Sequence, residues 1–167
     1  MVGASHATWA RAFASQALAD LTTRDLLASQ SAPKCHRLHF LQMSAEKLCK
    51  AFLIQANGFD SLAYKHCLVA KTLPLVLRRV LESSKQNSHQ IQTQLRSIRH
   101  LSREIELLSP SCDSNGGRPD NVEYPWTDEL GEVHFPADHP FSNLPDEGRD
   151  MLRLTKLMRT AAELFLA

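Results

Sequence analysis

Positively charged side chains recur at helical spacing in two parts of the chain, and they are the first candidates for binding chemistry. One row lies near the C-terminus: Arg149, Arg153, Lys156 and Arg159. A second row lies earlier in the chain: Arg96, Arg99 and Arg103. Residues three or four positions apart share a face of a helix, so each row would present a line of cations. Because such cations hold phosphate oxygens, two facing or adjacent rows indicate a site for a nucleotide or a nucleic-acid backbone.

Two plainer interpretations of these rows stay open. Each row can be an ordinary solvated helix face. Alternatively, an acidic segment can neutralise the rows, because residues 110–150 carry ten acids against Arg118 and Arg149, whereas the whole chain has a net charge of +1. The acidic segment would then dock on the basic body, within one chain or between two copies. Individual surface ion pairs contribute little free energy, so they would guide this docking more than stabilise it.

Motifs for a specific reaction are not found. Gly116-Gly117 lacks both the following Lys-Ser/Thr and the preceding strand of a phosphate-binding loop, and there is no G-x-S-x-G or H-E-x-x-H. Cys35 and His39 lie at i and i+4, and His66 and Cys67 add possible ligands, but this spacing fits no established zinc finger. We therefore expect no metal site and no cofactor.

The cysteines carry a second expectation. The chain has four of them, none in a C-x-x-C pair: Cys35, Cys49, Cys67 and Cys112. No apolar stretch near the N-terminus is long enough for a secretion signal, and no stretch approaches about 18 apolar residues, so we expect neither export nor a membrane span. In the cytoplasm, the expected compartment, all four would be reduced thiols, three of them packed on helices.

The apolar pattern predicts an all-α fold, an antiparallel up-and-down bundle of four or five helices forming one domain over residues 1–167. Apolar residues recur at helical spacing around 6–29, 34–56, 61–82, 91–108 and from 143 or 144 onward. Pro74 either kinks the third helix or opens a new one. In the last helix, Pro145 would lie in the first turn, where Asp146, Glu147 and Asp150 complement the helix dipole.

Residues 110–143 form a long acidic insert before the last helix. Tyr124–Trp126 and Val133–Phe135 predict a short β-hairpin that turns at Asp128 to Gly131. A long non-helical segment in a small domain is either functional or a packed lid, and both interpretations stay open. Its aromatic side chains either anchor it to the helices or stack on a base.

The second predicted helix carries a more specific pattern. Residues 36–53 read HRLHFLQMSAEKLCKAFL, with the A-E-K-x-x-K-A run from Ala45 to Ala51. This run resembles the HEPN domain family, as do His66 near the next helix and the Tyr124-Pro125 pair before the last one. The likeness covers about residues 8–167. It implies an antiparallel bundle of four or five helices that often forms dimers.

The resemblance also implies a set of functions. Family members include RNA-cleaving toxins, partners of small nucleotidyltransferases and non-catalytic nucleotide-binding modules. The ribonucleases use an Arg and a His with four to six residues between them near the last helix, and no His of this chain has an Arg at that spacing upstream. Arg96 and His100 come nearest, with three residues between them, on the earlier helix. We therefore expect a non-catalytic module that binds a nucleotide, RNA or a partner protein of the nucleotidyltransferase type, as a homodimer.

Alternatives to this function stay open. One is a ribonuclease with a displaced site formed by Arg96, Arg99 and His100. Another is a purely structural interaction domain, in which the cationic rows meet only the acidic insert. Lys47 and Lys50 likewise either line a ligand groove, as in the family, or pair with acids across the bundle; Glu46 lies at i, i+4 to Lys50.

Overall fold

The computed structural model describes residues 5–58, 66–112 and 120–167, and it confirms the all-α fold with an insert before the last helix. Five α-helices lie in these ranges: α1 (His6–Ser29), α2 (Lys34–Asn57), α3 (Val69–Glu82), α4 (Ser88–Glu106) and α5 (Arg149–Leu166). A 3-10 turn, η1 (Pro110–Cys112), follows α4, and two short strands, β1 (Trp126–Thr127) and β2 (Val133–His134), lie in the insert. No described helix has the length and apolarity needed to cross a membrane.

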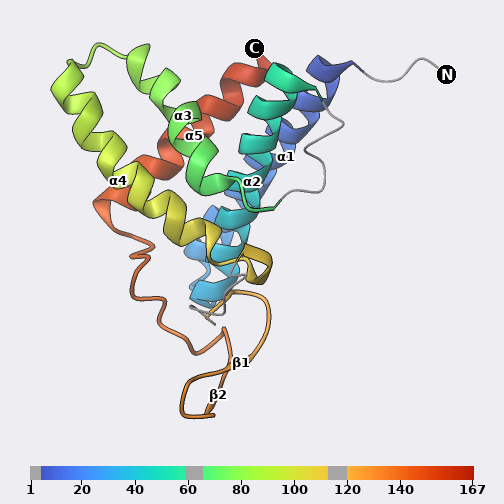
Figure 1. Cartoon of the computed structure of the whole chain (residues 1–167), viewed down its shortest axis with the longest axis vertical. Coiled ribbons are helices and arrows are strands. Elements are labelled where there is room, and N and C mark those ends of the chain that lie inside the picture. Colours follow the sequence, from blue (N-terminus) through green and yellow to red (C-terminus); the bar gives the residue numbers. More distant parts are fainter. Residues whose placement is uncertain (1–4, 59–65, 113–119) are drawn as a thin grey trace.

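Among the described helices, α1 and α2 have the most extensive contact, and they form an antiparallel hairpin (Figure 1). Ser5 caps α1, since its hydroxyl accepts a hydrogen bond from the amide of Thr8 at 3.2 Å. The buried face of α1 is lined by small residues: Ala10, Ala14 and Ala17. Small side chains allow a close approach of α2, and the Ser44 hydroxyl of α2 donates to the carbonyl of Ala17 at 2.8 Å.

Two turns separate α1, α2 and the segment that follows. The α1–α2 turn contains Ser31, with a positive φ of 54°, and Pro33. Gly58 ends α2 with φ 85°, and its amide donates to the carbonyl of Ile54 at 2.9 Å. A side chain at Gly58 would meet the ring of His6 at 2.8 Å, so both backbone angle and space favour glycine here.

The second hairpin, α3–α4, packs beside the first (Figure 1). The predicted helix over 61–82 begins only at Val69; residues 59–65 lie outside the described ranges, and residues 66–68 are not helical. Pro74 lies inside α3 and is buried, so it does not open a new helix. Asn87 and Gln90 form a capping box at the start of α4, which fixes the helix before its first apolar residue.

The last helix begins later than predicted. Asp146 and Glu147 precede α5, and only Asp150 lies in its first turn. The reason is tertiary: the Asp146 carboxylate is drawn into ion pairs with Arg24 of α1 and Arg37 of α2, so the chain reaches the helical conformation only after Gly148. Removing one partner of a buried ion pair costs more than losing a charge near a helix terminus.

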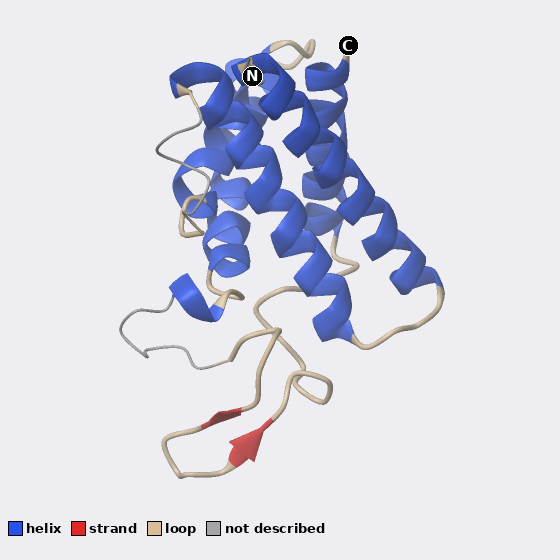
Figure 2. Cartoon of the chain, turned by 90° about the vertical axis from the view of Figure 1, so that its right-hand side faces the viewer, coloured by secondary structure: helices blue, strands red, loops and turns tan. Residues whose placement is uncertain are grey.

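The predicted hairpin of the insert is confirmed, with shorter strands. The two strands pair antiparallel with Trp126 opposite His134 and Thr127 opposite Val133. Figure 2 shows this hairpin projecting beyond one end of the helices. The remainder of the insert is anchored, because Val122, Phe141 and Leu144 are buried in the same apolar core as the helices.

A disulfide joins Cys67, just before α3, to Cys112 in η1. The expectation of four reduced thiols is therefore wrong for this pair, and only Cys35 and Cys49 lie on described helices. The α3–α4 hairpin brings two residues that are 45 positions apart to a Cα separation of 5.3 Å, a coincidence that sequence spacing does not reveal. Burial raises the pKa of the Cys49 thiol well above its ordinary value, which leaves that thiol unreactive.

Breaking this disulfide should lower the free energy of unfolding by about 2–4 kcal/mol, because closing a loop of this length restricts the unfolded chain. Urea unfolding with and without dithiothreitol measures the difference. In the Cys112→Ser variant the reductant should have no further effect. Equal stability of the oxidised wild type and Cys112→Ser would contradict a stabilising crosslink.

Candidate functional site

The α4 cations contribute to a groove between α3 and α4. Arg99 and Arg103 line it from α4, and Lys71 and Arg78 line it from α3. The groove has a volume of about 160 Å³ and its floor is apolar, formed by Pro74 and Leu95 among others. The sequence predicted the α4 cations as candidates but not their neighbours on α3.

Three of the four cations around this groove are not engaged in ion pairs within the described residues. The exception is Arg78, whose Nε lies 2.7 Å from Glu82 Oε1. Lys71, Arg99 and Arg103 are exposed, and none of them forms an ion pair with an acid in residues 5–58, 66–112 or 120–167. Nearby Glu106 instead accepts the amide of Ala70 at 3.0 Å, at the first turn of α3. The groove is therefore a concentrated positive surface above an apolar floor.

Arg96 and His100 do not line the groove, although both are exposed on α4. Successive residues of a helix are turned by about 100°, so His100 points away from Arg99. The three residues of the displaced ribonuclease site are thus not focused on one cavity of the described structure. Among the described residues that line the groove there is no histidine or carboxylate.

The predicted cationic row of α5 does not face a single site, because Arg153 and Arg159 contact different helices. Arg153 lines a separate groove of about 470 Å³, together with Gln90, Gln94 and other polar residues at the start of α4. Arg159 instead lies 2.9 Å from Asp25 of α1. Six residues on a helix turn by about 600°, which leaves these two arginines about 120° apart around the axis. Arg149 and Lys156 are exposed.

Lys47 and Lys50 make ion pairs within the bundle. The Lys47 ammonium lies 2.5 Å from Asp20 of α1. The Lys50 ammonium lies 2.7 Å from Glu46, the i, i+4 partner that the sequence predicted, and His66 Nδ1 lies 3.2 Å from the same Glu46 oxygen. The Lys47–Asp20 pair joins α2 to α1 across the bundle, as the structural alternative expects. The Lys50–Glu46 pair lies within α2, and it is Glu46 that contacts the segment before α3 through His66.

Asp146, which follows the insert and precedes α5, docks on two arginines that the sequence did not single out. Asp146 is buried, and its Oδ1 accepts a hydrogen bond of 2.5 Å from Arg24 Nη2, which also donates to the Asp146 carbonyl at 3.0 Å. Arg37 Nε lies 3.0 Å from Asp146 Oδ2, an ion pair whose angle is poor for a hydrogen bond. Arg24 continues the buried stripe of Ala17 and Leu21 on α1. A cation at an apolar position of a helix was the sequence signal that could have indicated a buried ion pair.

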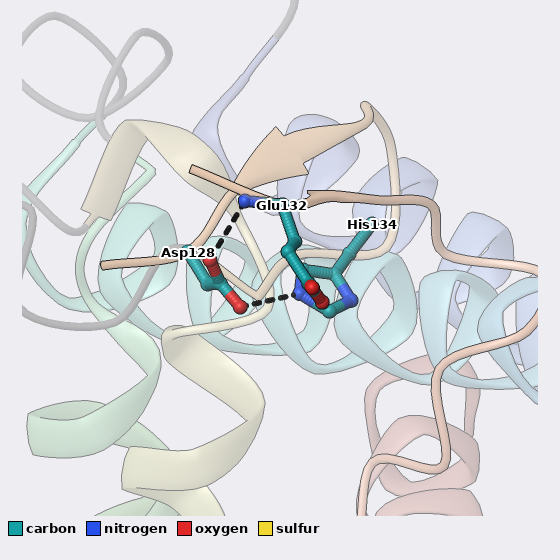
Figure 3. Close-up of side chains that lie close together, drawn as sticks. All are labelled: Asp128, Glu132 and His134. Carbon is teal, nitrogen blue, oxygen red and sulfur yellow. Dashed lines mark hydrogen bonds and ion pairs between the residues drawn. The ribbon is translucent and has the colours of Figure 1, made fainter. Parts of the chain in front are cut away.

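A second polar cluster lies on the β-hairpin. Asp128, Glu132 and His134 each point a ligand atom toward the others, and these atoms all lie within 4.8 Å of one another (Figure 3). Asp128 Oδ2 lies 2.9 Å from His134 Nε2. Asp128 was predicted to lie in the turn but not to belong to a polar cluster. The D-x-x-x-E-x-H spacing of Asp128, Glu132 and His134 across that turn was the available signal.

The hairpin cluster borders a cavity of about 380 Å³. Trp126 is central to it, with its ring stacked on His134 at a centroid distance of 5.9 Å and edge-on to His139 at 5.1 Å. Across this ring, His139 Nε2 lies 3.7 Å from Asp120. Two Asp–His pairs therefore flank one tryptophan, whose ring contacts lie within the insert itself.

Comparisons of the chain with protein-family models, with curated proteins and with solved structures find no match.

Replacing Asp146 by Asn should destabilise the protein by about 3–5 kcal/mol, because it removes the buried counter-ion that Arg24 and Arg37 share. Among the described residues, Arg24 would keep only Asp25, and Arg37 only Glu147, and both of these carboxylates are largely exposed. Urea unfolding measures this loss. Glu147→Gln is the matched control. The Glu147 side chain is 85% exposed and lies 3.8 Å from Arg37, so this weak, solvated pair should change stability very little when it is lost. Similar effects of the two substitutions would contradict the importance of the buried pair.

Proposed function

We propose that this protein is a non-catalytic binding module that takes a phosphate-bearing ligand, a nucleic-acid backbone or a nucleotide, in the α3–α4 groove. The observation that carries the proposal is the convergence of Lys71, Arg99 and Arg103, without ion-pair partners among the described residues, on one groove. Surface cations in a bundle of almost neutral net charge are usually dispersed among acids. Here α3 and α4 together carry six lysines and arginines against three glutamates.

The geometry of the groove favours a ligand with more than one phosphate. Arg99 and Arg103 lie one helical turn apart, about 6 Å along the axis, and Lys71 faces them from α3. Such a pair can hold one phosphate from two sides or two successive phosphates of a strand. The apolar floor below them can contact a sugar or the face of a base.

The absence of an acid–base group supports binding rather than cleavage. Cleavage of RNA needs a proton-transferring side chain beside the phosphate. The described residues that line the groove supply cations and apolar contacts only. A ribonuclease acting through Arg96, Arg99 and His100 remains the alternative, with His100 turned away from the groove.

The resemblance to HEPN domains adds support for a homodimeric, nucleotide-related module with a nucleotidyltransferase-type protein partner. The described helices form a bundle with the hairpin pairing α1–α2 and α3–α4, as an antiparallel bundle requires. The proposed compartment is the cytoplasm. Thiols are kept reduced there, so Cys67 and Cys112 would pair only under oxidising conditions.

Removing two groove cations should weaken RNA binding. In fluorescence anisotropy with a single-stranded RNA oligonucleotide at about 50 mM salt, Arg99→Ala combined with Arg103→Ala should reduce affinity at least tenfold. The slope of log K against log salt should become shallower by roughly 1.4, because each lost phosphate contact contributes about 0.7 for a single strand. Competition with ATP and with inorganic phosphate separates a nucleotide ligand from a strand.

The matched control is Arg149→Ala combined with Lys156→Ala, which removes the same charge from exposed positions of α5. This variant should bind RNA within about twofold of the wild type. Equal losses in the two double variants would show that only net charge matters and would contradict the groove.

Incubation of RNA with the purified protein should leave the RNA intact, as followed on a denaturing gel. Degradation by the wild type that disappears in His100→Ala would overturn the non-catalytic proposal in favour of the displaced ribonuclease site. Degradation that persists in His100→Ala would mark a contaminating nuclease, and it would then be removed before the assay is repeated.

A further inference from the structure

The β-hairpin is held in shape mainly by one carboxylate. Strands of two residues each are too short for a stable hairpin by themselves. Asp128 compensates, because its Oδ1 accepts the amides of Leu130 and Glu132, both at 2.9 Å. Gly131 allows the loop to close with a φ of 80°, in a region that favours glycine. The second oxygen of Asp128 is thereby directed at His134.

This loop brings three potential metal ligands together. Figure 3 shows the carboxylates of Asp128 and Glu132 beside the imidazole of His134. Around a tetrahedral Zn²⁺ with bonds near 2.1 Å, ligand atoms lie about 3.4 Å apart. The Asp128–His134 separation is 2.9 Å, and all three ligand atoms lie within 4.8 Å of one another, so side-chain adjustments without a change of the loop suffice.

The donor types select a class of metal. One imidazole nitrogen and two carboxylate oxygens suit a divalent transition metal such as Zn²⁺, whereas Ca²⁺ and Mg²⁺ prefer oxygen ligands alone. Three protein ligands also leave a coordination position for water or another ligand.

Two of the three ligands are positioned before any metal arrives. Hydrogen bonds fix the Asp128 carboxylate, and the stacked Trp126 ring restricts the orientation of His134. An aspartate carboxylate is ionised at neutral pH, as metal binding requires.

We propose that Asp128, Glu132 and His134 bind one Zn²⁺ or similar divalent transition-metal ion at the end of the β-hairpin. The ion would replace the proton between Asp128 and His134 and would link the end of β1 to the start of β2. This site is independent of the α3–α4 groove, which contains none of these residues.

Isothermal titration calorimetry of the full, chelator-treated chain with Zn²⁺ tests the site. The wild type should bind one ion per chain. Glu132→Gln and His134→Ala should each weaken binding at least tenfold, because each removes one of three ligands. Glu129→Gln is the matched control, since Glu129 lies exposed in the same loop outside the cluster, and it should bind within about twofold of the wild type.

Three results would overturn the proposal. They are no saturable Zn²⁺ binding by the wild type up to about 1 mM, equal affinities of Glu132→Gln and Glu129→Gln, and full affinity in His134→Ala. Titration with Ca²⁺ adds a further check: binding of Ca²⁺ as tight as that of Zn²⁺ would show that the imidazole is not a ligand. Circular dichroism of each variant should match the wild type, because Asp128, which orders the loop, is unchanged in all of them.

Discussion

The structure depends on one buried carboxylate, that of Asp146, which lies between two arginines from different helices. Arg24 is placed on the buried stripe of α1, where a guanidinium is costly without a counter-ion. Asp146 supplies that charge and contacts Arg37 of α2 as well. Because Asp146 is close to the start of α5, the same contact fixes the end of the insert and the start of the last helix. Lys34 strengthens the junction by donating to the carbonyls of Pro140 and Phe141 at 2.8 and 3.0 Å.

This contact also decides which positive charges stay available. The sequence allowed the acidic insert to fold onto the cationic rows of the last two helices and neutralise them. In the described residues Asp146 and Glu147 are drawn to Arg24 and Arg37, and Asp150 accepts a hydrogen bond from Ser97 at 2.6 Å. Asp128 and Asp120 pair with histidines of the insert itself. The described acids of residues 110–150 thus form no ion pair with Lys71, Arg99 or Arg103, and within the described residues the groove keeps its positive charge.

The features of the fold that depend on residues close together in the sequence could be predicted from local patterns. The helical spacing of apolar residues found all five described helices, and the turn at Asp128–Gly131 found the hairpin. Three other features depend on contacts between segments that are distant in the sequence, and local patterns do not reveal such contacts. They are the start of α5, the Cys67–Cys112 disulfide and the α3 side of the groove. The cationic rows show the same limit. The four cations of the last helix do lie at helical spacing, but they do not face one common site. Arg153 faces the start of α4 and Arg159 contacts Asp25 of α1, and these neighbours depend on how the helices pack.

The proposed binding of a phosphate-bearing ligand in the α3–α4 groove can be tested by nuclear magnetic resonance of the ¹⁵N-labelled chain titrated with single-stranded RNA. We expect the largest amide shift changes on residues 70–78 of α3 and 95–103 of α4. Changes concentrated on α5 or on the β-hairpin, with α3 unaffected, would contradict it.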